Sequence, residues 1–166
     1  MEIKRHFGVY SVCFENGKLF CIEKTRGPYQ HRYNLPGGSQ RLGEGLTETL
    51  TREVMEETGF TVRSYSNPRI YDVFVREELK NFMVHHVIAL YDVEMDEDAP
   101  QVTISKAVSD GINDSFGYIW MDIQEVTEEN ASPLVLKVKA ELLGFPELDK
   151  ISYMNWKVND EKPTSS

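Results

Sequence analysis

The stretch GGSQRLGEGLTETLTREVMEETGF, residues 37–60, is the part of the sequence from which the fold and the chemistry can be predicted. It predicts a helix from about Gly45 to Thr58, with Gly59 ending it, because glycine readily takes the left-handed conformation that follows many helices. At about 100° per residue, three acidic side chains near the end of this helix share one face; they are Glu53, Glu56 and Glu57.

These three glutamates create an electrostatic problem. They crowd the last turn of the predicted helix, where the helix dipole is negative and a cation would be stabilising. Each like-charged pair destabilises an isolated helix by about 0.2–0.5 kcal/mol, and Arg52 is the only basic residue within the helix. No other lysine or arginine is clearly placed by the sequence to neutralise them. The pattern therefore indicates an external positive charge, for which a divalent metal ion is the natural candidate.

The apolar residues of the same helix indicate where the glutamates lie. Leu46, Leu50 and Val54 recur every four residues and form the stripe that packs against the core. Glu53 and Glu57 lie beside this stripe, at the boundary between core and solvent. Mg²⁺ prefers such oxygen ligands and is usually shared with substrate phosphates. The arrangement therefore suits the hydrolysis of a pyrophosphate bond.

Gly38, Glu44 and the run REVMEETGF, residues 52–60, resemble a complete Nudix box, in which every specified position is filled. The order of strands, loop, long strand and late helix around it is also similar to the Nudix family, from about Lys4 to Leu143. The resemblance implies an α+β fold, an α/β/α sandwich around a mixed central β-sheet. It also implies an enzyme that hydrolyses a nucleoside diphosphate linked to another group.

The same resemblance implies a role for each matched position. The ligands of Mg²⁺ or Mn²⁺ would be the three glutamates Glu53, Glu56 and Glu57, together with the Gly37 carbonyl. The catalytic residues would be Glu53, Arg52 and Glu57. Glu53 is alternatively the base that deprotonates the attacking water, and Arg52 would orient the carboxylates through charge-assisted hydrogen bonds.

Two further groups of residues complete the expected site. The structural brace around the box would consist of Glu44, Gly38 and Gly59. Family members often use another acidic residue from a later loop, for which Asp110 and Asp114 are the candidates. Arg26 and Arg41 are candidates for binding substrate phosphates, and the alternative for both is ordinary surface charge. His85 and His86 are neighbours on a predicted strand, so they face opposite sides and do not form one metal site.

Outside the box the pattern predicts mostly strands. Asn16-Gly17 indicates a hairpin between residues 4–14 and 18–24, with Cys13 opposite Phe20. Further expected elements are strands at residues 60–65, 69–75, 82–94 and 116–121, and a helix from Pro133 to Gly144. One Nudix-type domain is expected over residues 1–146. Residues 147–166 are expected to form a C-terminal extension, docked to about residue 158 and disordered beyond it.

Composition excludes several classes of function. The 166 residues suit one domain, and the formal net charge of −9 argues against a polymeric nucleic-acid partner, while allowing a small phosphorylated nucleotide-type substrate. No apolar run approaches the ~20 residues that span a membrane, and the first residues lack the organisation of a signal peptide. A cytoplasmic protein without a membrane partner is therefore expected. Cys13 and Cys21 are expected to be free thiols, and the resemblance suggests a homodimer.

The expected activity is that of a pyrophosphohydrolase dependent on Mg²⁺ or Mn²⁺, in which water attacks one phosphorus of a diphosphate bridge. Its substrate would be a nucleoside triphosphate, oxidised forms included, or a nucleotide sugar. Two alternatives belong to other classes. A non-catalytic nucleotide sensor would keep the fold and bind without turnover. A prenyl-diphosphate isomerase, which resembles this fold, would need a cysteine in its pocket and would release no phosphate compound.

Overall fold

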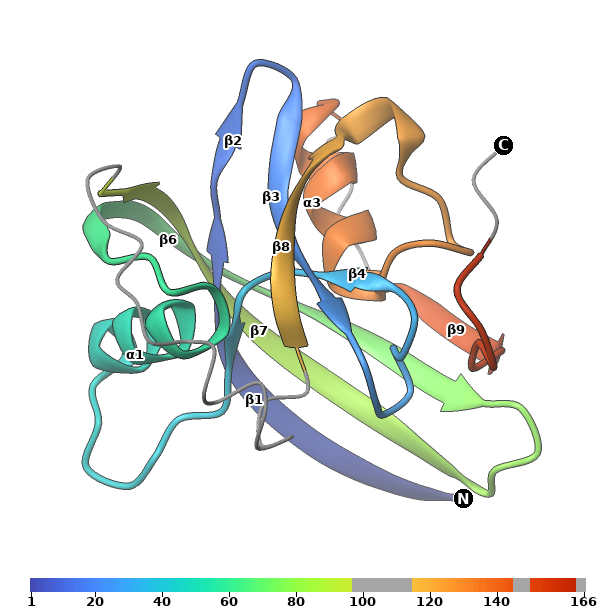
Figure 1. Ribbon diagram of the computed structural model, residues 1–166. Helices are drawn as coiled ribbons and strands as arrows, with labels where there is room; N and C mark the ends of the chain where they lie inside the picture. The colour runs from blue at the N-terminus through green and yellow to red at the C-terminus, as the bar shows by residue number, and fades with distance from the viewer. Residues whose placement is uncertain (97–114, 145–149, 164–166) are drawn as a thin grey trace.

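The computed structural model describes residues 1–96, 115–144 and 150–163 (Figure 1). Its largest unit is a mixed sheet with five strands in the order β5 (Gly37–Gly38), β1 (Glu2–Val12), β7 (Phe82–Met95), β6 (Val62–Glu77) and β9 (Ser152–Trp156). Strand β1 runs parallel to β7, and β6 runs parallel to β9. The β5–β1 and β6–β7 pairs are antiparallel.

A second, antiparallel sheet is built on β3 (Lys18–Lys24). Strand β3 pairs with β2 (Phe14–Glu15), β4 (Tyr33–Asn34) and β8 (Ser115–Asp122). The described helices are α1 (Leu46–Thr58), α3 (Pro133–Leu142) and the short 3₁₀ helix η1 (Ile123–Glu125). Within the described part of the chain, no helix has the length and apolar character that crossing a bilayer requires.

Helix α1 covers one face of the five-stranded sheet (Figure 1). The packed side chains come from the helix and from β1 and β7: Leu50, Val54, Val9, Ala89 and Val93. Leu46, the first residue of the predicted apolar stripe, is 37% exposed, so packing begins one turn later. The stripe fixes the rotation of α1 about its own axis and therefore the direction in which its glutamates point.

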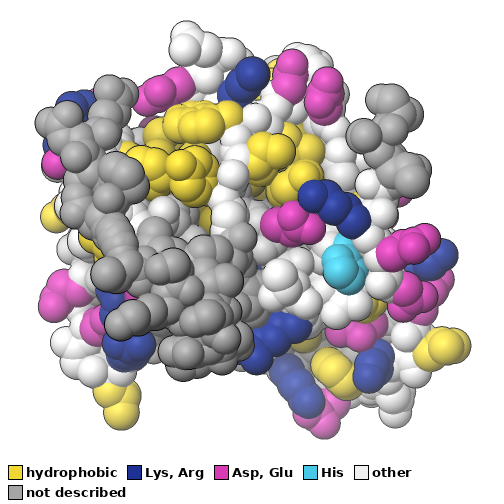
Figure 2. Space-filling view, viewed as in Figure 1, with side chains coloured by type: hydrophobic (Ala, Val, Ile, Leu, Met, Phe, Trp, Pro, Cys, Tyr) yellow, Lys and Arg dark blue, Asp and Glu magenta, His cyan; other side chains and the backbone are white. Residues whose placement is uncertain are grey.

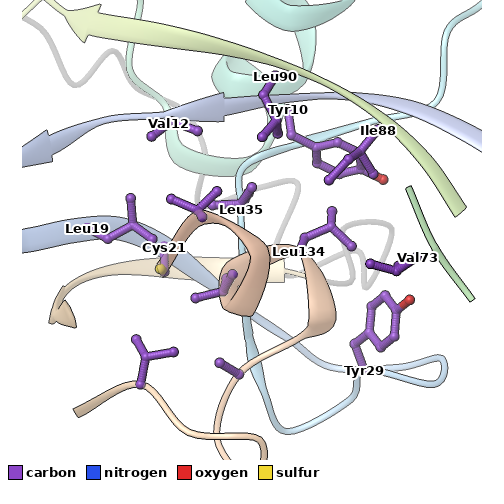
Figure 3. Close-up of a cluster of buried hydrophobic side chains, with 14 of the residues drawn as sticks. Tyr10, Val12, Leu19, Cys21, Tyr29, Leu35, Val73, Ile88, Leu90 and Leu134 are labelled. Atoms are coloured by element: carbon purple, nitrogen blue, oxygen red, sulfur yellow. The ribbon is translucent and has the colours of Figure 1, made fainter. Parts of the chain in front are cut away.

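The opposite face of the sheet holds the larger core (Figure 3). Side chains of β1 and β7 meet side chains of β3 and α3 there, among them Tyr10, Val12, Leu19, Cys21, Ile88, Leu90 and Leu134. Helix α3 begins with Pro133, and the Ser132 hydroxyl caps it by accepting the Val135 N–H at 3.3 Å. A mixed sheet between α1 and α3 confirms the predicted α/β/α fold, with the strands divided between two sheets.

The predicted hairpin is correct only at its tip. Phe14 pairs with Leu19, the Phe20 N–H donates to the Cys13 carbonyl at 2.9 Å, and Asn16 and Gly17 form the turn. The prediction that residues 4–14 pair with residues 18–24 along their whole length is wrong. Strand β1 leaves the hairpin at Val12 and lies between β5 and β7 in the other sheet, where both of its faces can be buried.

The two strands predicted at residues 60–65 and 69–75 are one strand, β6. The expected turn is an irregularity between Ser66 and Arg69, where Asn67 has a φ of 53°. A bulge accommodates Pro68, which has no N–H to donate to the neighbouring strand. The strand predicted at residues 82–94 is confirmed as β7, and that at 116–121 as β8.

The C-terminal residues take part in the sheet. Strand β9 adds to the edge of β6, and Trp156 is 2% exposed, with its Nε1–H donating to the Pro28 carbonyl at 3.0 Å. Contacts continue beyond residue 158, where the sequence predicted disorder. The Asn159 amide donates to the Glu129 carbonyl at 3.0 Å, and Lys162 lies 3.1 Å from the Glu23 carboxylate. These contacts with Glu129 and Glu23 hold residues 159–162 against the domain.

Candidate active site at the end of α1

The two ends of α1 position the acidic side chains. Gly45 precedes the helix, and its N–H donates to the Glu48 carboxylate at 3.0 Å. Gly59 ends the helix with a φ of 78°, and its N–H donates to the Met55 carbonyl. The last turn of α1 contains no basic residue, so the electrostatic problem read from the sequence is present in the structure.

Arg52 is the centre of the site. Its Nε donates to Glu44 at 2.6 Å and its Nη2 donates to the other oxygen of the same carboxylate at 2.9 Å. Its Nη1 donates to Glu53 at 3.0 Å and to Glu56 at 3.2 Å. A further Nη2 hydrogen bond, of 3.0 Å, reaches the Ser39 carbonyl. One planar guanidinium therefore orients three carboxylates and the preceding loop.

Glu44 anchors that loop to the helix. Besides Arg52, its carboxylate accepts from the Arg41 N–H at 2.9 Å and from the Thr49 hydroxyl at 3.0 Å. Hydrogen bonds from Arg52 and then from the Arg41 backbone lower the pKa of Glu44 to about 2. Through these hydrogen bonds, Glu44 holds both Arg52 and the loop that contains Arg41.

The glycine pair lets the carboxylates lie against the sheet. The Gly37 N–H donates to the buried Glu57 carboxylate at 2.7 Å. A Cβ atom at Gly37, whose φ is 149°, would lie 2.2 Å from the Val9 carbonyl oxygen, and one at Gly38 would lie 2.8 Å from the Glu53 carboxyl carbon. Any side chain at either position would push β5 away from β1 or displace Glu53.

Partial burial sets the electrostatics of the glutamates. Desolvation raises the pKa of Glu53, against the opposing effect of its hydrogen bond to Arg52. Glu56 is more exposed, and Arg41 lies 3.4 Å from it. The sequence did not clearly place any basic side chain outside the helix near the glutamates, and the structure places Arg41 beside Glu56. Arg41 is 64% exposed on its side chain, so solvent screens much of its charge.

The donor set suits a hard divalent cation, although it is not assembled around one. Among the described residues, no three acidic, histidine or cysteine side chains are gathered closely enough to hold a metal ion. Three carboxylates of one helix face are nevertheless the oxygen donors that Mg²⁺ and Mn²⁺ prefer, and one of them, Glu57, is 7% exposed. Asp110 and Asp114 lie outside the described residues.

A cavity of about 620 Å³ lies on the other face of the five-stranded sheet, starting at Tyr10. Its walls come from β1, β3, β6, β7 and the loop that contains Arg26. Of the two arginines predicted to bind substrate, Arg26 lines this cavity, whereas Arg41 lies beside Glu56 instead. Neither Cys13 nor Cys21 lines it, and both thiols are buried and free.

Three buried polar side chains in the cavity wall form a hydrogen-bonded chain that no sequence pattern indicates. Tyr10 Oη lies 3.1 Å from His86 Nε2, and Tyr29 Oη lies 3.5 Å from His86 Nδ1. Burial lowers the pKa of His86 to about 3, so the imidazole is neutral. His85 faces the other way and contacts Asp72 at 2.6 Å, as the alternation of strand residues predicted. Only the pairing of β1 with β7 brings Tyr10 and His86 together.

Comparison with known proteins places this geometry in a family. The NUDIX domain family model matches residues 3–142. A protein from Lactococcus lactis subsp. cremoris (strain MG1363), named a probable DHNTP pyrophosphohydrolase, is 33% identical over 97 residues, which cover 55% of either chain. An ADP-ribose pyrophosphatase from Methanocaldococcus jannaschii is 30% identical over 63 residues, covering 38% of this chain and 37% of that protein. The chain thus spans only part of the length of these curated relatives.

Solved structures agree at the level of the fold. A MutT NUDIX hydrolase from Burkholderia pseudomallei superposes with a TM-score of 0.55 at 14% identity, covering 83% of this chain and 97% of the other. A NUDIX hydrolase from Nitrosomonas europaea gives a TM-score of 0.56 at 22% identity, covering 85% and 90%.

Proposed function

This chain belongs to the Nudix family, and from that premise we propose that it is a divalent-metal-dependent pyrophosphohydrolase acting on a nucleoside diphosphate derivative. The observation that carries the proposal is the Arg52 network, in which one guanidinium holds Glu44, Glu53 and Glu56 while Glu57 is fixed by the Gly37 N–H. A network of this kind keeps several carboxylates pointing in one direction against their mutual repulsion. Mg²⁺ or Mn²⁺ would remove that repulsion.

With Glu53 as the base, the residues that would hold the metal are Glu56, Glu57 and the Gly37 carbonyl. When bound, the ion supplies charge neutralisation of phosphoryl oxygens and lowers the pKa of a coordinated water. Glu53, whose pKa is already raised by burial, is the residue we assign as the base. The water oxygen forms a new P–O bond, and its proton passes to Glu53. The bridging P–O bond breaks, and its electron pair stays with the leaving phosphate oxygen.

The substrate class includes nucleoside triphosphates, oxidised forms among them, and nucleotide sugars. The curated relatives are named a probable DHNTP pyrophosphohydrolase and an ADP-ribose pyrophosphatase, which supports cleavage of a pyrophosphate bond in this class of substrates. Arg26 would contact phosphates within the cavity, and Arg41 would contribute positive charge beside Glu56. The prenyl-diphosphate isomerase alternative loses support, because neither cysteine lines the cavity.

Glu57→Gln tests the proposal. The variant keeps the size of the side chain and an acceptor for the Gly37 N–H, but it removes one negative charge from the metal site. We expect release of phosphate compounds from nucleotide substrates in Mg²⁺ to fall by at least about 100-fold, with an unchanged far-UV circular dichroism spectrum. Glu78→Gln, a loop residue remote from α1, makes the same charge change and should keep full turnover. Turnover at the wild-type level in Glu57→Gln would refute the assignment.

A nucleotide sensor without activity is distinguished by the same measurements. It would bind nucleotides tightly in calorimetry while wild-type protein releases no product from any of them in Mg²⁺ or Mn²⁺.

A further inference from the structure

We propose that His6 is a positioning residue for the active site, which holds the loop between β5 and α1 through Ser39 and thereby keeps Arg52 oriented toward the glutamates. The inference rests on the proposed function, because it takes the carboxylates of α1 to be the metal site. It assigns a role to a histidine that lies outside residues 37–60 and belongs to no motif of the sequence.

The loop that follows β5 has little regular structure to fix it. Strand β5 is two residues long, and its pairing with β1 ends at Val9–Gly38 within the described residues. Residues 39–43 are all exposed. The Gln40 amide donates to the Glu44 carbonyl at 2.6 Å, which is a contact inside the loop itself. Contacts that fix the loop against the sheet and the helix must therefore come from side chains outside it.

Ser39 receives such contacts from two directions. Its carbonyl accepts from Arg52 Nη2 at 3.0 Å, and its hydroxyl lies 3.0 Å from His6 Nε2. Arg52 in turn donates to Glu53 at 3.0 Å and to Glu56 at 3.2 Å. Successive hydrogen bonds through Ser39 and Arg52 thus link His6 to the carboxylates of α1.

The edge of the sheet lets a side chain from the cavity face reach the loop that leads to the other face. His6 precedes the part of β1 that pairs with β5, so within the described residues no strand lies beside it on that side. On its other side it is directly opposite His86 of β7. Its side chain lines the cavity, whereas its Nε2 contacts the loop. The contact therefore joins the two faces around the edge of β1.

The hydrogen-bonded chain of Tyr10, His86 and Tyr29 supports the His6 ring. The rings of His6 and His86 meet edge to face, with centroids 4.7 Å apart and an interplanar angle of 77°. His86 is 5% exposed, and each of its nitrogens has a tyrosine hydroxyl as partner. A buried ring whose polar atoms are both satisfied is a rigid surface for a neighbour to pack against. The buried chain thereby limits the positions that the His6 ring can take.

The surroundings of His6 keep its imidazole neutral near pH 7. Partial burial, and then the charge of Lys24, lower the pKa of His6. Lys4 and Arg5 line the same cavity, and Figure 2 shows Lys and Arg side chains lying close together in the lower part of one face. Positive neighbours disfavour a further positive charge. A neutral imidazole can donate to the Ser39 hydroxyl or accept from it, whichever nitrogen carries the proton.

Two amide side chains of different length test the contact. Glutamine can place its amide nitrogen where His6 Nε2 lies, whereas asparagine is one methylene shorter and cannot reach Ser39. Both are neutral, so His6→Gln and His6→Asn differ mainly in that reach. We expect His6→Asn to raise the Mg²⁺ concentration for half-maximal hydrolysis about 3- to 10-fold and to lower kcat by a similar factor, with a smaller change in KM, and His6→Gln to stay within about twofold of wild type.

Ser39→Ala removes the same contact from its other side. Its effect on the Mg²⁺ dependence and on kcat should match that of His6→Asn. The variant that combines both substitutions should lose no more than either single variant, because one contact can be lost only once. Losses that multiply in the combined variant would mean that the two residues act independently, which contradicts the inference.

Limited digestion with trypsin measures the loop without reference to activity. Arg41 lies in the loop, and its side chain is 64% exposed. A loop released from His6 should be cut after Arg41 at least about threefold faster in His6→Asn and in Ser39→Ala. Lys80, in the exposed turn between β6 and β7, is the internal reference, and the rate of cleavage after it should not change. If both sites are cut faster in His6→Asn, that variant is partly unfolded, and Ser39→Ala, on an exposed loop residue, decides.

Hydrolysis with wild-type Mg²⁺ dependence in both His6→Asn and Ser39→Ala overturns the inference and leaves the hydrolase standing. Equal losses in His6→Gln and His6→Asn overturn it as well, because reach to Ser39 would then not matter. If the wild-type protein hydrolyses no nucleotide, the proposed function fails. The rate of cleavage after Arg41 and the affinity for Mg²⁺ in calorimetry then still decide whether His6 orders the loop and the acidic cluster, and values equal to wild type in both variants refute that role.

Discussion

The two faces of the five-stranded sheet are built in contrasting ways. The α1 face carries an acidic cluster whose members all come from residues 37–60. Arg52 holds Glu44, Glu53 and Glu56, and the Gly37 N–H holds Glu57. The cavity face is basic, and its lining comes from strands and loops far apart in the sequence. The acidic cluster is formed by residues close together in the sequence, so a motif can encode it. The cavity forms only when β1, β6 and β7 have paired. The acidic cluster and the basic cavity are thus separated by a single layer of strands.

The largest expected effect comes from a substitution that displaces β5 from its place beside β1 at the edge of the sheet. Gly37→Ala would place a Cβ atom 2.2 Å from the Val9 carbonyl oxygen, so β5 must move away from β1 and the Gly37 hydrogen bond to Glu57 is lost. We expect a loss of at least about 3 kcal/mol in the free energy of unfolding, measured by urea denaturation, together with loss of turnover. Gly43→Ala is the control, because its φ of 86° is also strained but its Cβ meets nothing within 4 Å. It should cost only about 1–2 kcal/mol, and equal losses for the two variants would contradict the steric account.

Arg52→Lys tests whether the acidic cluster depends on a planar fork. An ammonium group keeps the charge but cannot reach Glu44, Glu53 and Glu56 together. Turnover should fall about 10- to 100-fold, as is found when groups that orient metal ligands are lost, with weaker dependence on Mg²⁺ in a titration. If Arg52→Lys retains wild-type turnover and Mg²⁺ dependence, charge alone explains the cluster.

The same contrast explains how far the sequence could be interpreted. Helix α1, its capping glycines and the direction of its glutamates follow from spacing and periodicity, which are local properties. The pairing of β1 with β5 and β7 was not predictable. An Asn-Gly turn indicates a hairpin, but it does not indicate whether the residues before Val12 remain part of that hairpin. The bulge at Asn67 was predicted as a turn for a similar reason, since the same residue types occur in bulges as in turns between strands.

Among the site residues, Arg52 was assigned by its position in the motif, and its contacts reach Glu44, Glu53 and Glu56. The Tyr10–His86–Tyr29 chain could not be anticipated, because it is created by the pairing of strands that are distant in sequence. Arg26 and Arg41 were both predicted to bind substrate phosphates, and the fold brings Arg26 to the cavity and Arg41 to Glu56.

On the cavity face, His86 predicts a dependence of stability on pH. Its pKa is about 3 in the folded protein and about 6.5 when unfolded. Between these values the unfolded chain binds the extra proton, so stability falls as the pH decreases below 6.5. From pH 7.5 to 5.0 the loss from this residue is about 2 kcal/mol. Urea denaturation of His86→Gln, which keeps a polar side chain beside Tyr10, should show a pH dependence smaller by that amount. An unchanged difference between the two pH values would mean that His86 is charged or exposed in the folded protein.

The smallest effect should come from the exposed edge of the acidic cluster. Arg41 and Arg52 both contact Glu56, at 3.4 and 3.2 Å, but the Arg41 side chain is 64% exposed and the Arg52 side chain only 17%. Solvent and the entropy of a long side chain reduce such an exposed pair to about 0–1 kcal/mol. Arg41→Gln should therefore lower the free energy of unfolding by less than about 1 kcal/mol, and addition of 0.5 M NaCl should abolish the difference from wild type. A loss as large as that of Arg52→Gln would show that the rim of the cluster is as well ordered as its centre, because only a desolvated pair resists screening by salt.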